Sequence, residues 1–180
     1  MRNSAKRAAV FGALLALSAA LAVAESMIGA LFPLPVPGVK LGIANIVSLF
    51  LLCCFSLSSA LTISFLRTLL ASLFFGGLGM FVYSAPGALL STLAMYIALR
   101  RLKSLSIAGV SMIGACVHNI AQVCVAVLIT GETGLFFYGF VLLIAGAVSG
   151  AVTGIAARVT MPRIAAALNV RCKISMVKEV

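Results

Sequence analysis

Long apolar runs, separated by short polar or glycine-rich segments, make up most of the chain. We place these runs at about Ala8 to Ala24, Leu41 to Phe55, Ala60 to Phe75, after Pro86-Gly87 to Leu99, Ser106 to Thr130 and Leu135 to Ala157. Runs of about 15 to 25 residues suit a hydrocarbon core about 30 Å thick, although the second run is short. The pattern therefore predicts six transmembrane helices.

Composition agrees with a membrane protein. Hydrophobic residues make up 63% of the 180 residues, charged residues only 9%, and the mean hydropathy is +1.26. This leaves too little polar surface to cover a soluble protein. We predict an all-α integral membrane protein of the cell membrane, with a single domain over residues 1–180. The helical bundle covers about residues 8–158, and a basic cytoplasmic tail covers 159–180.

The distribution of charge predicts the topology. The sequence contains 13 Lys and Arg residues and three acidic residues, which gives a net charge of +10. The basic residues cluster at the ends of apolar runs, so the charge indicates membrane topology and contact with anionic lipid, and we predict no nucleic-acid partner. With both termini cytoplasmic, the basic clusters at Arg2 to Arg7, Arg100 to Lys103 and Arg158 onward lie inside. Glu25 and Glu132 then lie outside.

The first apolar run has two interpretations. A basic start, an apolar core and small residues before Glu25 fit a cleaved signal peptide. However, Gly12, Ala16, Ala20 and Ala24 recur every four residues and form a ridge of small residues along a helix. We expect a retained, cytoplasmic N-terminus. The ridge fits either docking of a partner or ordinary packing inside the bundle.

A rigid loop connects the first two runs. Residues 33–45, PLPVPGVKLGIAN, contain three of the five prolines, together with Lys40 and Asn45. Proline fixes φ and irregular backbone at membrane depth must be buried by protein or line a wet cavity, so we expect this loop to fold onto a site. A tight connection with Lys40 at the lipid headgroups is the alternative. The predicted topology gathers this loop with residues 76–84 and 131–134 on the outer face.

Polar residues inside the runs are few. Arg67 lies midway along the third run, where a charge costs at least about 2.5 to 3.5 kcal/mol, so it should face a wet cavity or a counter-charge. Because we expect no acidic residue at comparable depth, Arg67 is a candidate for binding an anionic or electron-rich ligand. The alternative is that it caps backbone carbonyls at a kink.

A second polar group lies in the fifth run. His118 and Gln122 share a helix face and Asn119 lies roughly 100° away, so the three can line one wall of a pocket, to which Asn45 is a further candidate. The alternative is a histidine that only bonds a neighbouring helix. In the sixth run, Gly146, Gly150 and Gly154 predict close helix packing.

The sequence lacks the residues that several kinds of catalytic and metal-binding site require. The sequence contains no aspartate and no P-loop, and its acids are Glu25, Glu132 and Glu179, which are scattered. We therefore expect no catalytic residues and no cofactor. A single histidine is too little for a metal site. The five cysteines form no CxxC motif and are expected to be small apolar packing residues.

Four segments also carry a family resemblance. PGVKLGIANIVSLFLL (37–52), Arg67-Thr68, the stretch from Ser84 to Ser91 and SMIGACVHNIAQVCVA (111–126) resemble the Gx transporter family, often labelled heptaprenyl diphosphate synthase component I. The similarity covers most of the chain between Leu31 and Arg158, and Ala88 stands where a second glycine is expected. This family resembles the S components of energy-coupling-factor importers.

The resemblance implies a function. S components have six helices, an outward pocket capped by loops, and a small-residue face on the first helix that docks to a scaffold subunit with two ATPases. We therefore interpret the chain as the substrate-binding subunit of an ATP-driven importer for a small, anionic or electron-rich molecule. The alternative is a non-catalytic accessory protein of isoprenoid or quinone metabolism, or of extracytoplasmic flavin use. The synthase label fits poorly with a chain that has no aspartate.

Overall fold

The computed structural model describes residues 4–31, 42–75, 77–102, 104–170 and 172. Within these ranges the chain is helical and contains no strand. The helices are α1 (Ser4–Leu31), α2 (Asn45–Cys54), α3 (Leu57–Phe75), α4 (Gly77–Arg101), α5 (Ile107–Thr130) and α6 (Leu135–Ala167). The predicted all-α fold is confirmed. Most of the proline-rich loop, including Lys40, lies outside the described residues.

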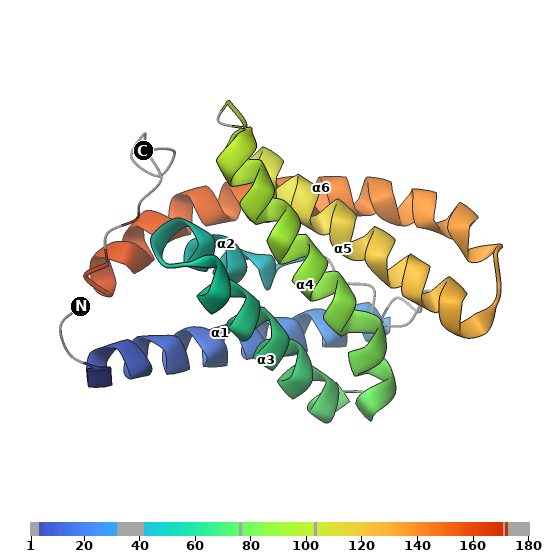
Figure 1. Cartoon of the computed structure of the whole chain (residues 1–180), viewed down its shortest axis with the longest axis horizontal. Helices are drawn as coiled ribbons and strands as arrows, with labels where there is room; N and C mark the ends of the chain where they lie inside the picture. Colours follow the sequence, from blue (N-terminus) through green and yellow to red (C-terminus); the bar gives the residue numbers. More distant parts are fainter. Residues whose placement is uncertain (1–3, 32–41, 76, 103, 171, 173–180) are drawn as a thin grey trace.

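Five helices are long and apolar enough to cross a membrane, and α2 is not. At 1.5 Å per residue, its 10 residues span about 15 Å, half of the hydrocarbon core. Every residue of α2 except Ile46 is buried. Figure 1 shows α2 inside the bundle, where it contacts each of the other helices. Of the predicted run 41–55, the described helix therefore covers residues 45–54, as a half-length helix inside the bundle.

Local capping explains why α5 has the bounds that the sequence predicts. The Ser106 hydroxyl accepts a hydrogen bond from the backbone N–H of Gly109 at 3.2 Å, which satisfies a donor at the helix start. At the other end Gly131 adopts φ 74°, a left-handed conformation that favours glycine, and its N–H donates to the Val127 carbonyl.

Three other boundaries differ from the prediction. Helix α1 continues past Ala24 to Leu31, and α6 continues past Ala157 to Ala167. Helix α4 begins at Gly77 and runs through Pro86, so residues 77–84 are helical and form no loop. Proline is tolerated inside transmembrane helices because neighbouring groups satisfy the freed carbonyl.

The glycines of α6 bring it very close to α5, as the sequence predicts. A Cβ added at Gly150 would lie 2.7 Å from the Met112 Cα, and one added at Gly154 would overlap the backbone of Ala108. The Ser111 and Thr153 hydroxyls also hydrogen-bond at 3.0 Å across this interface. Helices α5 and α6 therefore pack backbone against backbone.

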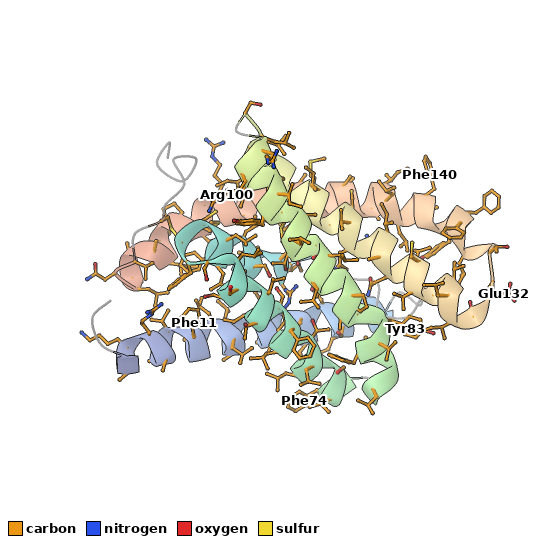
Figure 2. All side chains as sticks on the ribbon, in the orientation of Figure 1. Phe11, Phe74, Tyr83, Arg100, Glu132 and Phe140 are labelled. Carbon is orange, nitrogen blue, oxygen red and sulfur yellow. A yellow bond between two sulfur atoms is a disulfide. The ribbon has the colours of Figure 1, made fainter. Side chains whose placement is uncertain are left out.

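The outer surface of the bundle is apolar. Phe74, Leu128 and Phe137 are each at least 75% exposed, which suits contact with lipid tails. Figure 2 shows Phe74 and Phe140 pointing away from the bundle, while Glu132 lies at the turn between α5 and α6. The start of α1 and the end of α6 lie at the opposite end from that turn (Figure 1). The chain is thus a membrane protein, and the cytoplasmic position of its termini stays a prediction.

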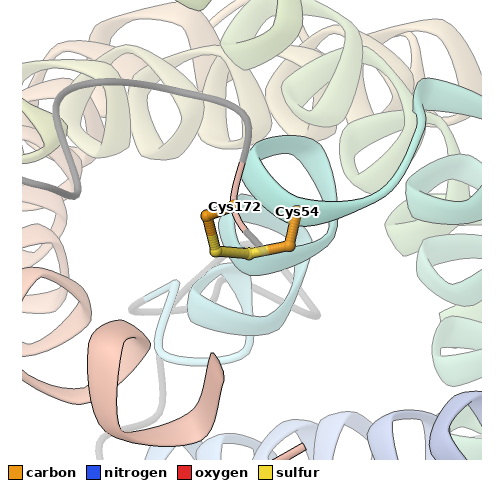
Figure 3. The surroundings of a disulfide bond; sticks show 2 residues. All are labelled: Cys54 and Cys172. Atoms are coloured by element: carbon orange, nitrogen blue, oxygen red, sulfur yellow. A yellow bond between two sulfur atoms is a disulfide. The ribbon is translucent and has the colours of Figure 1, made fainter. Parts of the chain in front are cut away.

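A disulfide joins the end of α2 to the segment after α6. It links Cys54 to Cys172, which are 118 residues apart in the sequence (Figure 3). The expectation that all five cysteines are packing residues is wrong for these two, because folding brings together residues that no short motif connects. Cys53, next to the bridge, is a free thiol buried in the core.

Candidate functional site

Polar side chains from four helices meet in one small cavity, to which a fifth helix adds an alanine. Its walls come from α1, α3, α4, α5 and the beginning of α2, and are formed by Ala22, Glu25, Gly42, Ala44, Asn45, Arg67, Thr68, Ala88, Ala115 and His118. The cavity volume is about 10 Å³, which is room for about one water molecule. Three of the predicted substrate-binding residues, Asn45, Arg67 and His118, are brought together here.

Arg67 is the central cation of this cavity. It is 4% exposed, and its Nη2 donates a hydrogen bond to the Asn45 Oδ1 at 3.0 Å. Within the described part of the chain, its Nη1 has no hydrogen-bond partner. A buried guanidinium N–H without an acceptor is costly, since each buried polar group normally has one. The prediction that Arg67 faces a cavity or a counter-charge is confirmed.

The counter-charge is Glu25, which the sequence analysis placed outside the membrane. Because α1 extends past it, Glu25 lies within the helix, is 2% exposed and lines the same cavity as Arg67. The Glu25 carboxylate attracts the Arg67 guanidinium electrostatically. The expectations that Glu25 is external and that no acid lies at the depth of Arg67 are therefore wrong.

Glu25 also holds the turn that begins α2. Its Oε1 accepts a hydrogen bond from the Ile43 backbone N–H at 2.6 Å. Gly42 has φ 86°, where other residues are strained, and its carbonyl accepts from the Asn45 N–H at 2.9 Å. The carboxylate thus lies beside the N-terminus of a helix, where the macrodipole favours negative charge. This contact links α1 to α2.

Helix α4 approaches the cavity at Pro86-Gly87. A Cβ on Gly87 would lie 3.0 Å from the His118 carbonyl oxygen and 3.3 Å from its ring Cε1. Glycine therefore lets α4 come close to α5 where His118 enters the cavity. Ala88, at the position where a second glycine was expected, is itself a cavity wall residue and is 1% exposed.

Of the predicted wall, His118 lines the cavity, and Gln122 shares its face toward Gly87 without lining the cavity. Asn119 turns toward α6, where its Nδ2 donates to the Leu142 carbonyl at 2.9 Å, and it does not line the cavity either. Asn119 is a helix-packing residue, because the rotation of roughly 100° from its neighbour carries it to the α6 side. Gln122 is fully buried and packs beside Gly87 of α4.

A row of buried hydroxyls connects three helices one turn away from the cavity. Ser64 of α3 bonds both Ser48 of α2 and Thr92 of α4, each at 2.9 Å. Thr92 donates to the Ala88 carbonyl, and Thr68 donates to the Ser64 carbonyl at 2.6 Å. These bonds fix the helices that carry Asn45, Arg67 and Ala88, so they hold the cavity walls in position.

The sequence analysis missed Glu25 and Thr68. For Glu25 a signal was present, because the residues after it, from Met27 to Leu31, are again apolar, so one acid interrupts a longer run. Thr68 was named only within the Arg67-Thr68 pair of the family resemblance, because threonine is common in membrane helices and does not by itself indicate a site. The described part of the chain contains no group of three His, Cys, Asp or Glu residues that could hold a metal ion.

Comparison with known proteins places most of the chain in a family. A family model described as heptaprenyl diphosphate synthase component I matches residues 14–160. The chain belongs to this family. No curated protein matches it, and no solved structure does. The part that matches heptaprenyl diphosphate synthase component I contains every residue that lines the cavity. The resemblance to this family is thus confirmed.

Proposed function

We propose that this chain is the substrate-binding membrane subunit of an ATP-driven importer, and that its cavity binds a small molecule that presents an anionic or electron-rich group to Arg67. The observation that carries the proposal is the Arg67 Nη1, a buried donor without an acceptor in a polar cavity. A ligand oxygen or nitrogen there would supply the missing hydrogen bond. The cavity has room for about one water molecule, so a larger ligand requires its walls to separate.

The position of the cavity supports uptake from outside. Glu25 lies in the second half of α1, and Gly42 to Asn45 directly precede or begin α2. In the predicted topology both segments lie toward the outer face, next to the proline-rich loop. A ligand from the outer face would therefore approach Arg67 from the side of the cavity formed by Glu25 and Asn45.

The small-residue ridge of α1 supports docking to a scaffold subunit. Gly12, Ala16 and Ala20 are all exposed, and a Cβ on Gly12 would touch nothing within 4 Å. The ridge therefore does not pack inside this bundle. It is available to a partner helix whose backbone approaches closely. The ATPase activity would belong to the partner subunits.

The experiment is to isolate the membrane complex through an affinity tag on this chain. An importer subunit is expected to bring a transmembrane scaffold and two ATPases with it. Ala16→Leu and Ala20→Leu should abolish this association, because leucine holds the partner backbone away. The matched control is Ala145→Leu, which alters an exposed alanine of α6. Equal loss in the control, or isolation without ATPases, would contradict the importer proposal.

Small molecules retained during purification provide the second measurement. We expect mass spectrometry to find a compound that wild-type protein retains and Arg67→Ala loses. Arg67→Lys keeps the charge but loses the planar two-point donor, and should weaken retention by about 1.5 to 3 kcal/mol. If Arg67→Ala folds and retains the same compound, Arg67 is a structural residue.

A second candidate function rests on the family match. The description names one component of a synthase, which favours a non-catalytic accessory protein whose partner is another synthase component. The complex isolated above distinguishes the two functions, because this candidate requires a soluble prenyl-transferring partner in place of the ATPases. A catalytic role for this chain is not proposed, since no aspartate is available to bind diphosphate through Mg²⁺.

A further inference from the structure

Opposite charges line the cavity, and their balance restricts what it can bind. Glu25 and Arg67 are both at least nine-tenths buried, on different helices, and both face the same space. We propose that the ligand is neutral overall, as an uncharged or zwitterionic molecule, with an acceptor for Arg67 and a donor for Glu25. This inference rests on the proposed function only in placing the ligand in this cavity.

The electrostatic argument follows from burial. Glu25 and Arg67 line the same cavity and are both buried, so the cavity already holds one carboxylate and one guanidinium before a ligand enters. A simple anion would give the cavity two negative groups and one positive group, and a cation would give the reverse. Either leaves one charge uncompensated in a site with little water, which is costly. A neutral ligand adds no net charge.

The hydrogen-bonding capacity of the two residues supports a ligand with both donor and acceptor. The Arg67 Nη2 is engaged by Asn45, which leaves Nη1 as the open donor. Glu25 accepts one bond at Oε1 from Ile43, and a carboxylate has acceptor positions beyond that one. An amide, a urea or an amino acid carries donors and acceptors close enough together to satisfy both sides.

Two probes of equal size test the proposal. Formamide is neutral with a donor and an acceptor, whereas formate is an anion with the same number of heavy atoms. Thermal unfolding of the purified subunit is measured with each probe at equal ionic strength. In wild-type protein we expect formamide to raise Tm by at least about 2 °C more than formate does.

The variant Glu25→Gln should reverse this order. Glutamine keeps an oxygen for the Ile43 N–H but removes the charge, so Arg67 becomes an uncompensated cation. Formate should then stabilise the protein more than formamide does. Adding Arg67→Gln to the Glu25→Gln variant should remove this extra stabilisation by formate. The mirror variant, Arg67→Gln alone, leaves Glu25 uncompensated and should favour methylammonium over formamide.

Each outcome decides the proposal. It is overturned if formate outranks formamide in wild-type protein, if Glu25→Gln leaves the order unchanged, or if no probe stabilises any of the proteins. Should a variant fail to fold, the wild-type order and the other variant still decide. These measurements use the isolated subunit. If Glu25→Gln reverses the order of the probes but no ATPases co-purify with the chain, the importer proposal is contradicted and the proposal of a neutral ligand is kept.

Discussion

Replacing Gly150 by alanine tests whether backbone contact between α5 and α6 stabilises the bundle. The added Cβ would lie 2.7 Å from the Met112 Cα, and 3.0 Å from both the Ser111 carbonyl oxygen and the Ala115 Cβ, where ordinary contacts are 3.4–4 Å. The nearest of these atoms belongs to the backbone, so no side chain can rotate away. The two helices must therefore separate by a large fraction of an ångström.

The magnitude follows from two opposing effects. Overpacking of this kind costs about 1 to 3 kcal/mol, while alanine returns up to about 1 kcal/mol through its better helix propensity. A net loss of about 1 to 2 kcal/mol lowers Tm by about 2 to 8 °C in a chain of this size. The matched control is Gly12→Ala, whose Cβ touches nothing within 4 Å and should leave Tm equal or slightly higher.

Because the chain has no tryptophan, a thiol-reactive dye is the suitable reporter of unfolding. Cys53 is a free thiol that is 1% exposed, so it reacts only when the core opens. Unfolding is followed in detergent for wild-type protein, Gly150→Ala and Gly12→Ala. A Tm change of about 1 °C is too small for the predicted loss of stability. If Gly150→Ala unfolds within about 1 °C of wild type while Gly12→Ala behaves as expected, the close packing of α5 and α6 is refuted.

Three further outcomes are expected. Ser64→Ala should lower stability by about 1 to 2 kcal/mol, because it removes the hydroxyl that two neighbouring helices share; thermal unfolding checks this. Asn119→Ala should cost about 1 kcal/mol through loss of its bond to α6 and should leave formamide binding unchanged, since it lies outside the cavity. Alkylation of unfolded protein without reductant should modify the three free cysteines and spare Cys54 and Cys172; mass spectrometry showing five modified thiols would contradict the bridge.

The sequence predicted what local chemistry determines. Helix α5 was placed within one residue at its start because Ser106 and Gly131 cap it through bonds to near neighbours. Arg67 was expected to need a cavity or a counter-charge because the cost of an isolated buried charge does not depend on the fold. The glycines of α6 were expected to pack closely because small residues spaced four apart let two helix backbones approach in any membrane bundle.

The errors arise where tertiary contacts override a local signal. Pro86 was taken as a boundary, yet it continues inside α4 because membrane helices tolerate proline. Glu25 was taken as the polar end of a run, but the Ile43 N–H and Arg67 make it a buried residue, and these partners are distant in sequence. The short length of α2 likewise depends on five neighbouring helices that bury it.

The burial of Glu25 and Arg67 in one cavity also has a consequence for biogenesis. A charge at the centre of α3 makes that segment a poor membrane anchor by itself, at a cost of at least about 2.5 to 3.5 kcal/mol. Because α1 is synthesised first, Glu25 is already in the bilayer when Arg67 arrives. Retention of α3 in the bilayer during insertion thus depends on the Glu25 carboxylate of α1, which entered the bilayer two helices earlier.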